Sequence, residues 1–217
     1  MESQKNAKAF LLFGAFNPVS IAHVAMGKYL HDIYPDATIV YIPSSDAYLS
    51  SEWKRQNKYI PFKIRYDLLK ASVDEEYCVI SDIEDGGDAM RSIKTFDTVE
   101  VLKKEYDDIT ICLGEDKLSS LALWYKADEL IRNNNFVIFS RFFIKGFDNN
   151  DKLPPELSEY ADHFQLISWS GYTDVSSTSI RSAWQAGCLD AADYMMAKPV
   201  YEYLSTHRPE TILVERK

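Results

Sequence analysis

The segment from Phe13 to His23 combines residue types that can hold a phosphate group. Gly14 lets a ligand approach the main chain, and Pro18 fixes φ and stops the preceding strand from continuing. Ser20 is a candidate N-cap, so we expect the first amides of the next helix to point into the same space as the loop amides. His23 lies about one turn into that helix, where a ring nitrogen can donate to a phosphate oxygen. The spacing indicates an anion site, although a common glycine turn with a structural histidine is the alternative.

A second stretch, Val175 to Arg181, places hydroxyl side chains at the start of a helix. Ser176 or Ser177 can cap this helix, whose first backbone N–H groups have no partners within it. Thr178 can donate to a phosphate oxygen. Arg181 lies three residues further along the same face, where its guanidinium can bind an anion bidentately. An ordinary serine cap with a solvent-facing arginine is the alternative that the local pattern leaves open.

The elements that must position these residues alternate along the chain. Six apolar runs predict strands: Ala9–Phe13, Thr38–Pro43, Tyr77–Ser81, Ile109–Leu113, Phe136–Ser140 and Phe164–Ile167. Helical periodicity follows Ser20, Pro61 and Thr95, the last of these continuing to Tyr106. This alternation predicts an α/β protein with a Rossmann-like, doubly wound parallel sheet, which binds ligands at the carboxyl ends of its strands. Both the first loop and Gly114-Glu115-Asp116 follow such ends.

Segments rich in polar residues, glycine or proline separate these elements. We expect surface loops at Ser44–Tyr59 and Lys145–Pro155, and a solvated turn around Glu84, Asp85 and Asp88. The length suits a single domain, 1–217, in which about 176–217 form a small C-terminal helical part. The aromatic residues Phe142, Phe143 and Phe147 are a candidate homo-oligomer interface.

Composition restricts the partners and the compartment. Hydrophobic residues make up 46% of the 217 residues, enough for a sizeable core. The net charge of −9 argues against a nucleic-acid or anionic-membrane binder, so a phosphate ligand must be held by a few focused donors. Three widely spaced cysteines indicate neither a disulfide framework nor a zinc cluster, and no dedicated metal site is expected. A polar N-terminus without a long apolar segment predicts a cytoplasmic protein.

Taken together, the two phosphate motifs resemble those of a known superfamily. Gly14-x-Phe16-x-Pro18 followed by Ser20-x-x-His23 resembles the nucleotidylyltransferase signature, although Ser20 and Ala22 stand where that family usually has His or Thr and Gly. The stretch from Val175 to Arg181 resembles the Ile-Ser-Ser-Thr-x-Ile-Arg signature of its adenylyltransferases. The resemblance implies a nucleotidylyltransferase fold and an ATP site shared by both motifs.

Further matches resemble the nicotinamide and nicotinate mononucleotide adenylyltransferases. They are Lys94–Val99, Gly114-x-Asp116, Leu123-Trp124-Tyr125, Ser81–Glu84 and Ser45–Tyr48. The resemblance implies that the protein joins ATP and a pyridine mononucleotide into a dinucleotide and releases pyrophosphate, with Mg²⁺ arriving together with ATP. Another nucleotidylyltransferase of small substrates, or a non-catalytic nucleotide-binding regulatory protein, is the alternative.

The resemblance also implies roles for particular residues. His23 and Arg181 would be catalytic. ATP would contact Gly14, Ala15, Phe16, Ser20, His23, Gly114, Asp116, Ser177, Thr178 and Arg181. The mononucleotide would contact Asn17, Lys58, Thr95, Trp124 and Tyr125.

Several of these residues have a second interpretation. Asp116 and Thr95 could cap helices, and Trp124 could be plain core. Lys54 and Arg55 are candidates for the mononucleotide phosphate as Lys58 is, and solvated surface charge is the alternative for at least two of the three. Arg65 is either a helix-surface ion-pair member or part of the substrate lining.

Overall fold

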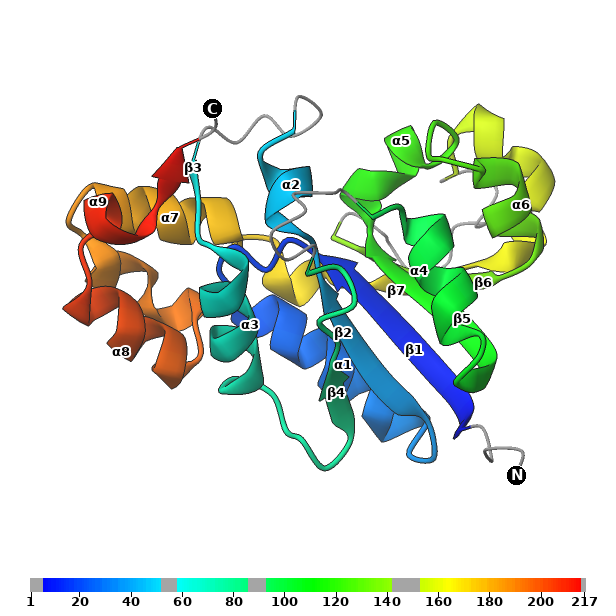
Figure 1. Cartoon of the computed structure of the whole chain (residues 1–217), viewed down its shortest axis with the longest axis horizontal. Coiled ribbons are helices and arrows are strands. Elements are labelled where there is room, and N and C mark those ends of the chain that lie inside the picture. Colours follow the sequence, from blue (N-terminus) through cyan, green and yellow to red (C-terminus); the bar gives the residue numbers. More distant parts are fainter. Residues whose placement is uncertain (1–5, 52–57, 86–92, 142–152, 216–217) are drawn as a thin grey trace.

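A six-stranded parallel sheet forms the centre of the molecule (Figure 1). The computed structural model describes residues 6–51, 58–85, 93–141 and 153–215. The strand order is β4-β2-β1-β5-β6-β7, so the direction of winding changes between β1 and β5. The strands are β1 (Asn6–Gly14), β2 (Thr38–Pro43), β4 (Cys78–Ile80), β5 (Tyr106–Gly114), β6 (Asn135–Ser140) and β7 (Phe164–Ser168). This order confirms the predicted doubly wound fold, with its ligand-binding edge at the carboxyl ends of β1 and β5.

One predicted helix is shorter in the structure, and the strands beside it are longer than predicted. The helix predicted from Thr95 to Tyr106 ends at Leu102, and Tyr106 is instead the first residue of β5. Tyr106 is buried and pairs in register with Asn6, so β1 also begins before Ala9. The pairing of β1 with β5 therefore sets where both strands begin. The periodicity of a single segment carries no information about such a distant partner.

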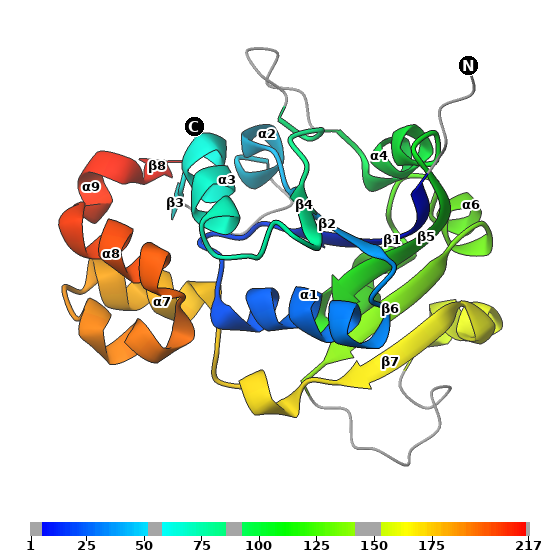
Figure 2. The same ribbon diagram turned by 90° about the horizontal axis from the view of Figure 1, so that it is seen from below.

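Helices cover both faces of the sheet because alternate strand residues point to opposite sides. Phe10 and Leu12 pack against α1, α3 and the C-terminal helices, whereas Ala9 and Leu11 pack against α4, α5 and α6. Figure 2 shows α1 and α4 on opposite faces. The bounds are α1 (Ile21–Ile33), α3 (Phe62–Lys70), α4 (Thr95–Leu102), α5 (Leu118–Leu121), α6 (Ala127–Arg132) and η4 (Pro155–His163).

The C-terminal helices gather at one end of the molecule, beside α3 (Figure 1). They are α7 (Ser177–Gln185), η6 (Leu189–Met195), α8 (Lys198–Thr206) and α9 (Pro209–Ile212), and the short helix η5 (Ser170–Tyr172) lies between β7 and α7 in the chain. Trp184 joins them, since its Nε1 donates to the carbonyl oxygens of Leu204 at 2.9 Å and His207 at 3.0 Å. Within the described residues, no helix is long and apolar enough to cross a membrane.

The prediction of a surface loop over Ser44–Tyr59 is wrong at both described ends, where the structure has a helix and a strand. Helix α2 (Asp46–Leu49) begins after Ser45, whose hydroxyl accepts from the Tyr48 amide, and β3 (Lys58–Tyr59) pairs antiparallel with β8 (Val214–Glu215). The long sequence separation between β3 and β8 hid this pairing. Other predictions fall outside the described residues: Lys54, Arg55, Asp88, the three phenylalanines at 142, 143 and 147, and most of the loop 145–155.

Candidate active site

The first loop follows β1 and is shaped by the ring of Phe16. Phe16 has a positive φ of 43°, an uncommon conformation for a residue with a side chain. Its ring lies over Gly14, where an added Cβ would come within 2.9 Å of two ring carbons. The same ring makes edge contacts with His23 and Tyr41. Gly14 is therefore needed because the phenylalanine ring occupies the space of a side chain.

Two consecutive amides of this loop are available to a ligand. Among the residues that the structure describes, the N–H groups of Ala15 and Phe16 have no hydrogen-bond partner. Backbone donors of this kind normally bind protein, water or a ligand, and successive ones in a turn form an anion-binding concavity. The predicted phosphate loop thus has the donors that it needs.

His23 is held as a neutral ring with a defined tautomer. Ser20 is the N-cap of α1, as predicted, and its backbone N–H donates to His23 Nδ1 at 3.1 Å. Because an amide can only donate, Nδ1 carries no proton, and the ring proton is on Nε2. Burial and the positive charge of Arg141 lower the pKa of His23 to about 4, with Asp116 acting in the opposite direction. His23 therefore offers an uncharged Nε2–H donor at neutral pH.

The second phosphate motif contacts the first directly. Ser177 Oγ donates to the Pro18 carbonyl at 2.7 Å, and Arg181 Nη1 donates to the Asn17 carbonyl. The two motifs, at opposite ends of the sequence, therefore border one site.

The remaining contacts of this motif decide between its two interpretations. Ser176 caps α7 by accepting from the Ser179 amide at 3.0 Å, so the cap prediction is confirmed. The solvent-facing alternative for Arg181 is wrong, because the residue is 7% exposed. Its burial lowers the pKa to about 10. Its Nη2 donates to Thr178 Oγ1 at 3.3 Å, which keeps the guanidinium beside the exposed start of the helix.

The end of β5 contributes Gly114 and Asp116. An added Cβ at Gly114 would lie 2.8 Å from Asp116 Oδ1. Asp116 belongs to the short helix η2 (Glu115–Lys117), is mostly exposed and pairs with Lys117. Gly114, not Asp116, is at the N-cap position, so the capping alternative for Asp116 is wrong. Its charge acts on His23, which places the two side chains at the same edge of the sheet.

The residues predicted to bind the mononucleotide differ in exposure and in their contacts within the protein. Trp124 is partly buried against the core, and Tyr125 is half exposed with its ring edge-on to Phe96. Thr95 is the first residue of α4 and Lys94 takes the N-cap position, so capping by Thr95 is wrong. Lys58 Nζ lies 2.8 Å from Glu215 Oε1, so a mononucleotide phosphate would have to compete with that carboxylate.

Asn17 is also engaged within the protein. Its Oδ1 accepts from the Ile60 amide at 2.9 Å, and the residue is fully buried. This contact ties the first loop to the segment before α3. The side-chain oxygen of Asn17 thus stabilises the loop by binding the protein's own backbone.

Two charged residues near the site are buried, against a surface position that the sequence left open for Arg65 and predicted for Glu84. Arg65 is fully buried, so it is not a helix-surface residue. Glu84, expected in a solvated turn, is 5% exposed and accepts from Thr98 Oγ1 at 3.1 Å. Burial raises the pKa of Glu84 to about 7, opposed by the Thr98 hydrogen bond and the charge of Arg65.

Sequence reasoning missed Arg141 altogether. It follows β6 directly, and its charge reaches His23 at the ligand-binding edge. A basic residue immediately after a predicted strand was the available signal. Among the described residues, no group of three or more His, Cys, Asp or Glu side chains is arranged to hold a metal ion.

The fold and the site define a Rossmann-like α/β protein with a candidate phosphate-binding site at the carboxyl end of β1. The chain belongs to the cytidylyltransferase-like family, whose model matches residues 11–183. This membership confirms the predicted nucleotidylyltransferase fold and superfamily.

Individual relatives agree with the finer resemblance. The "Probable nicotinate-nucleotide adenylyltransferase" of Geobacter sulfurreducens is 27% identical over 93% of this chain and 97% of its own. Its namesake from Caldicellulosiruptor bescii is 27% identical over 91% and 95%. Among solved structures, Plasmodium falciparum nicotinic acid mononucleotide adenylyltransferase complexed with NaAD has a TM-score of 0.70, at 16% identity over 92% of this chain and 95% of that one. This last likeness supports the fold.

Proposed function

We propose that this protein is an adenylyltransferase that joins ATP and nicotinate or nicotinamide mononucleotide, forming the dinucleotide and pyrophosphate. The observation that carries the proposal is the direct contact of the two phosphate motifs, Ser177 with Pro18 and Arg181 with Asn17. This contact brings two turns that are rich in hydrogen-bond donors to one site, as the binding of a triphosphate requires. Because the relatives are named for nicotinate, nicotinate mononucleotide is the first acceptor to test.

The reaction needs position and charge stabilisation, not a protein nucleophile. An oxygen of the mononucleotide 5′-phosphate attacks the α-phosphorus of ATP, and the bond from that phosphorus to the α,β-bridging oxygen breaks. The bridging oxygen keeps the electron pair and leaves with pyrophosphate. Catalysis then comes from aligning the two phosphates and stabilising charge on the transferring group.

Each half of the site has a role in this reaction. The neutral Nε2–H of His23 donates to an α-phosphate or bridging oxygen, and the amides of Ala15 and Phe16 hold the α-phosphate region. The start of α7, with Ser177, Thr178 and Arg181, holds the β- and γ-phosphates. Gly114 permits close approach of the nucleoside, and Asp116 accepts from its ribose hydroxyls.

The acceptor lies on the opposite side of the α-phosphate. There the indole of Trp124 stacks on the pyridine ring, with Tyr125 and Thr95 beside it. Mg²⁺ belongs to the substrate as its complex with ATP. Phosphate oxygens and water suit this hard cation, and the described residues offer it no carboxylate cluster.

Pyrophosphate release tests the proposal. The protein is incubated with MgATP alone, with added nicotinate mononucleotide and with added nicotinamide mononucleotide. We expect release that depends on a pyridine mononucleotide, with the dinucleotide formed in equal amount. ATP binding without release in any mixture would favour the regulatory protein. A fourth mixture contains a different phosphate acceptor, and release in that mixture alone would favour another nucleotidylyltransferase.

A further inference from the structure

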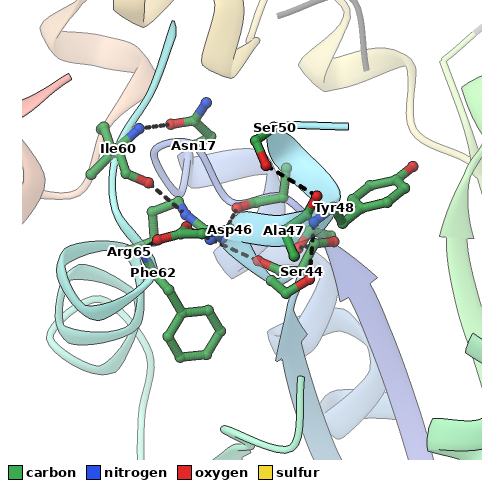
Figure 3. A network of polar contacts seen from close by, with 12 residues as sticks. Asn17, Ser44, Asp46, Ala47, Tyr48, Ser50, Ile60, Phe62 and Arg65 are labelled. Carbon is green, nitrogen blue, oxygen red and sulfur yellow. Dashed lines mark hydrogen bonds and ion pairs between the residues drawn. The ribbon is translucent and has the colours of Figure 1, made fainter. Parts of the chain in front are cut away.

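Arg65, on α3, is a charged residue with no exposure to solvent (Figure 3). Its Nε donates to the Ile60 carbonyl at 2.8 Å, Nη1 to the Ala15 carbonyl at 2.7 Å, and Nη2 to the Ser44 carbonyl at 2.7 Å. Nη2 also pairs with Asp46 Oδ1 at 2.9 Å. One guanidinium therefore binds three separate chain segments: the first loop, the turn after β2 and the segment before α3.

The contact with Ala15 orients the peptide that follows it. In a planar trans peptide the C=O and N–H bonds point in opposite directions. Because Arg65 Nη1 holds the carbonyl of Ala15, the N–H of Phe16 is turned away from Arg65. The Gly14 carbonyl is held similarly by the Ser44 amide at 2.9 Å, which turns the Ala15 N–H away from Ser44. The N–H groups of Ala15 and Phe16 are the consecutive loop amides that have no partner among the described residues.

Asp46 completes the connection between the segments. Its Oδ1 receives Arg65, and its Oδ2 accepts from the Phe62 amide at 3.0 Å. The neighbouring Ile60 amide donates to Asn17 Oδ1 at 2.9 Å (Figure 3). Burial disfavours the charge and lowers the pKa of Arg65, while Asp46 acts in the opposite direction. The pair joins a buried guanidinium to a partly exposed carboxylate. Burying such a charge often adds no more stability than apolar residues of equal volume would, so a gain in loop geometry is the better explanation.

We propose that Arg65 is a positioning residue that keeps the loop amides of Ala15 and Phe16 turned toward the nucleotide phosphates. It does so from beneath the loop, through carbonyl groups, without touching the ligand. The inference rests on the proposed function in that it takes the loop to bind ATP; it does not depend on the identity of the acceptor. A lysine cannot replace the arginine, because a single ammonium lacks the planar fork that reaches three carbonyl groups at once.

The test compares ATP with adenosine, which lacks the phosphates. Binding of each is measured by calorimetry for the wild type, for Arg65→Lys and for Lys63→Gln, an exposed lysine on the same helix. Near-ultraviolet circular dichroism checks that each variant is folded. We expect Arg65→Lys to weaken ATP binding about tenfold and to change adenosine binding less than about twofold. Equal weakening of ATP and adenosine binding would indicate a general loss of structure and would overturn the positioning role. Lys63→Gln should change neither.

Each remaining outcome decides the question. Equal ATP affinity in the wild type and folded Arg65→Lys would overturn the positioning role and leave the proposed function intact. A wild type that does not bind ATP would overturn the proposed function itself. If Arg65→Lys does not fold, Asp46→Asn is used as the test variant. Asparagine has one side-chain oxygen in place of two, so it can accept from Arg65 or from the Phe62 amide but not from both. A loss of about threefold for ATP alone supports the role, and unchanged ATP affinity overturns it.

Discussion

The two halves of the phosphate site hold a ligand by different means. The first loop offers backbone amides and the neutral ring of His23, and its shape depends on Arg65 buried beneath it. The second half offers the start of α7, and its side chains at Ser177 and Arg181 bind carbonyl groups of the first. Changes in the first half should therefore affect catalysis and pH dependence, whereas changes in the second should loosen the contact between the halves.

The largest expected effect is that of His23→Ala. Removing one positioned charge-stabilising donor typically costs about 2.7 to 4 kcal/mol of activation free energy, so kcat should fall by roughly 100-fold or more. The free energy of unfolding should fall by only about 1 kcal/mol, the value of the lost hydrogen bond from Ser20. Steady-state kinetics and denaturant unfolding measure the two quantities. His207→Ala, an exposed histidine of the C-terminal helices, is the control; wild-type turnover in His23→Ala would remove His23 from the mechanism.

Glu84→Gln should change the pH dependence of stability. The pKa of Glu84 rises from 4.5 to about 7 on folding, so the folded state binds its proton more tightly. The stability that it contributes is full below pH 4.5 and is lost as the pH rises through 7. At about 1.4 kcal/mol per pKa unit, the shift amounts to about 3 kcal/mol. Glutamine stays neutral and keeps an acceptor for Thr98, so the variant avoids this loss.

Denaturant unfolding at pH 4.5 and pH 8 measures this effect as a difference between variant and wild type. That difference cancels the contribution of His23, whose lowered pKa has the opposite sign, since its stability is lost as the pH falls from 6.5 toward 4. The exposed Glu76→Gln serves as the control. A Glu84→Gln variant with the same pH slope as the wild type would contradict the burial of a titrating carboxyl group beside the first loop.

Ser177→Ala tests the contact between the halves. It removes the donor to the Pro18 carbonyl, which should cost about 1 kcal/mol of unfolding free energy and raise KM for ATP a few-fold with a smaller change in kcat. Ser182→Ala removes an exposed hydroxyl from the same helix and should change neither quantity. If Ser177→Ala instead lowers kcat and leaves KM unchanged, Ser177 belongs to the half of the site that stabilises charge in the reaction.

The smallest effect is expected at Ala22, which stands where the family usually has glycine. Its methyl group is buried in the core on the α1 face of the sheet, so it should not crowd a nucleotide. Ala22→Gly should therefore leave kcat unchanged and cost about 1 kcal/mol of stability, the helix penalty of glycine. Ala25→Gly on the same helix measures that penalty independently. A several-fold rise in kcat for Ala22→Gly alone would show that the methyl group obstructs the site.

The sequence was sufficient for features that depend on local pattern. Periodicity predicted β2 at its observed bounds. The turn residues predicted Ser20 as one cap and left Ser176 or Ser177 as the other, which is Ser176 in the structure. The parallel, doubly wound sheet followed from the alternation of strands and helices, whereas the order of its strands came from the structure. Both phosphate motifs were recognised because their residue types and spacing suit a phosphate ligand.

Features that depend on distant partners could not be predicted. The burial of Arg65 could not be predicted, and its two interpretations stayed open, because its acceptors lie on three separate segments. Glu84 resembled part of a solvated turn because its donor, Thr98, is on the next helix. Lys58 resembled a free cation because Glu215, its partner, lies near the other end of the chain. In each case the burial or the partner of the residue is set by tertiary structure, which cannot be predicted from the composition of the local segment.

Adenylyl transfer is tested most directly by following the α-phosphate of ATP. The protein is incubated with nicotinate mononucleotide and MgATP labelled at either the α- or the γ-phosphate. Bond cleavage beside the α-phosphorus predicts that the α-label enters the dinucleotide and that the γ-label leaves as pyrophosphate. Recovery of the γ-label as inorganic phosphate, with no α-label joined to the mononucleotide, would contradict adenylyl transfer.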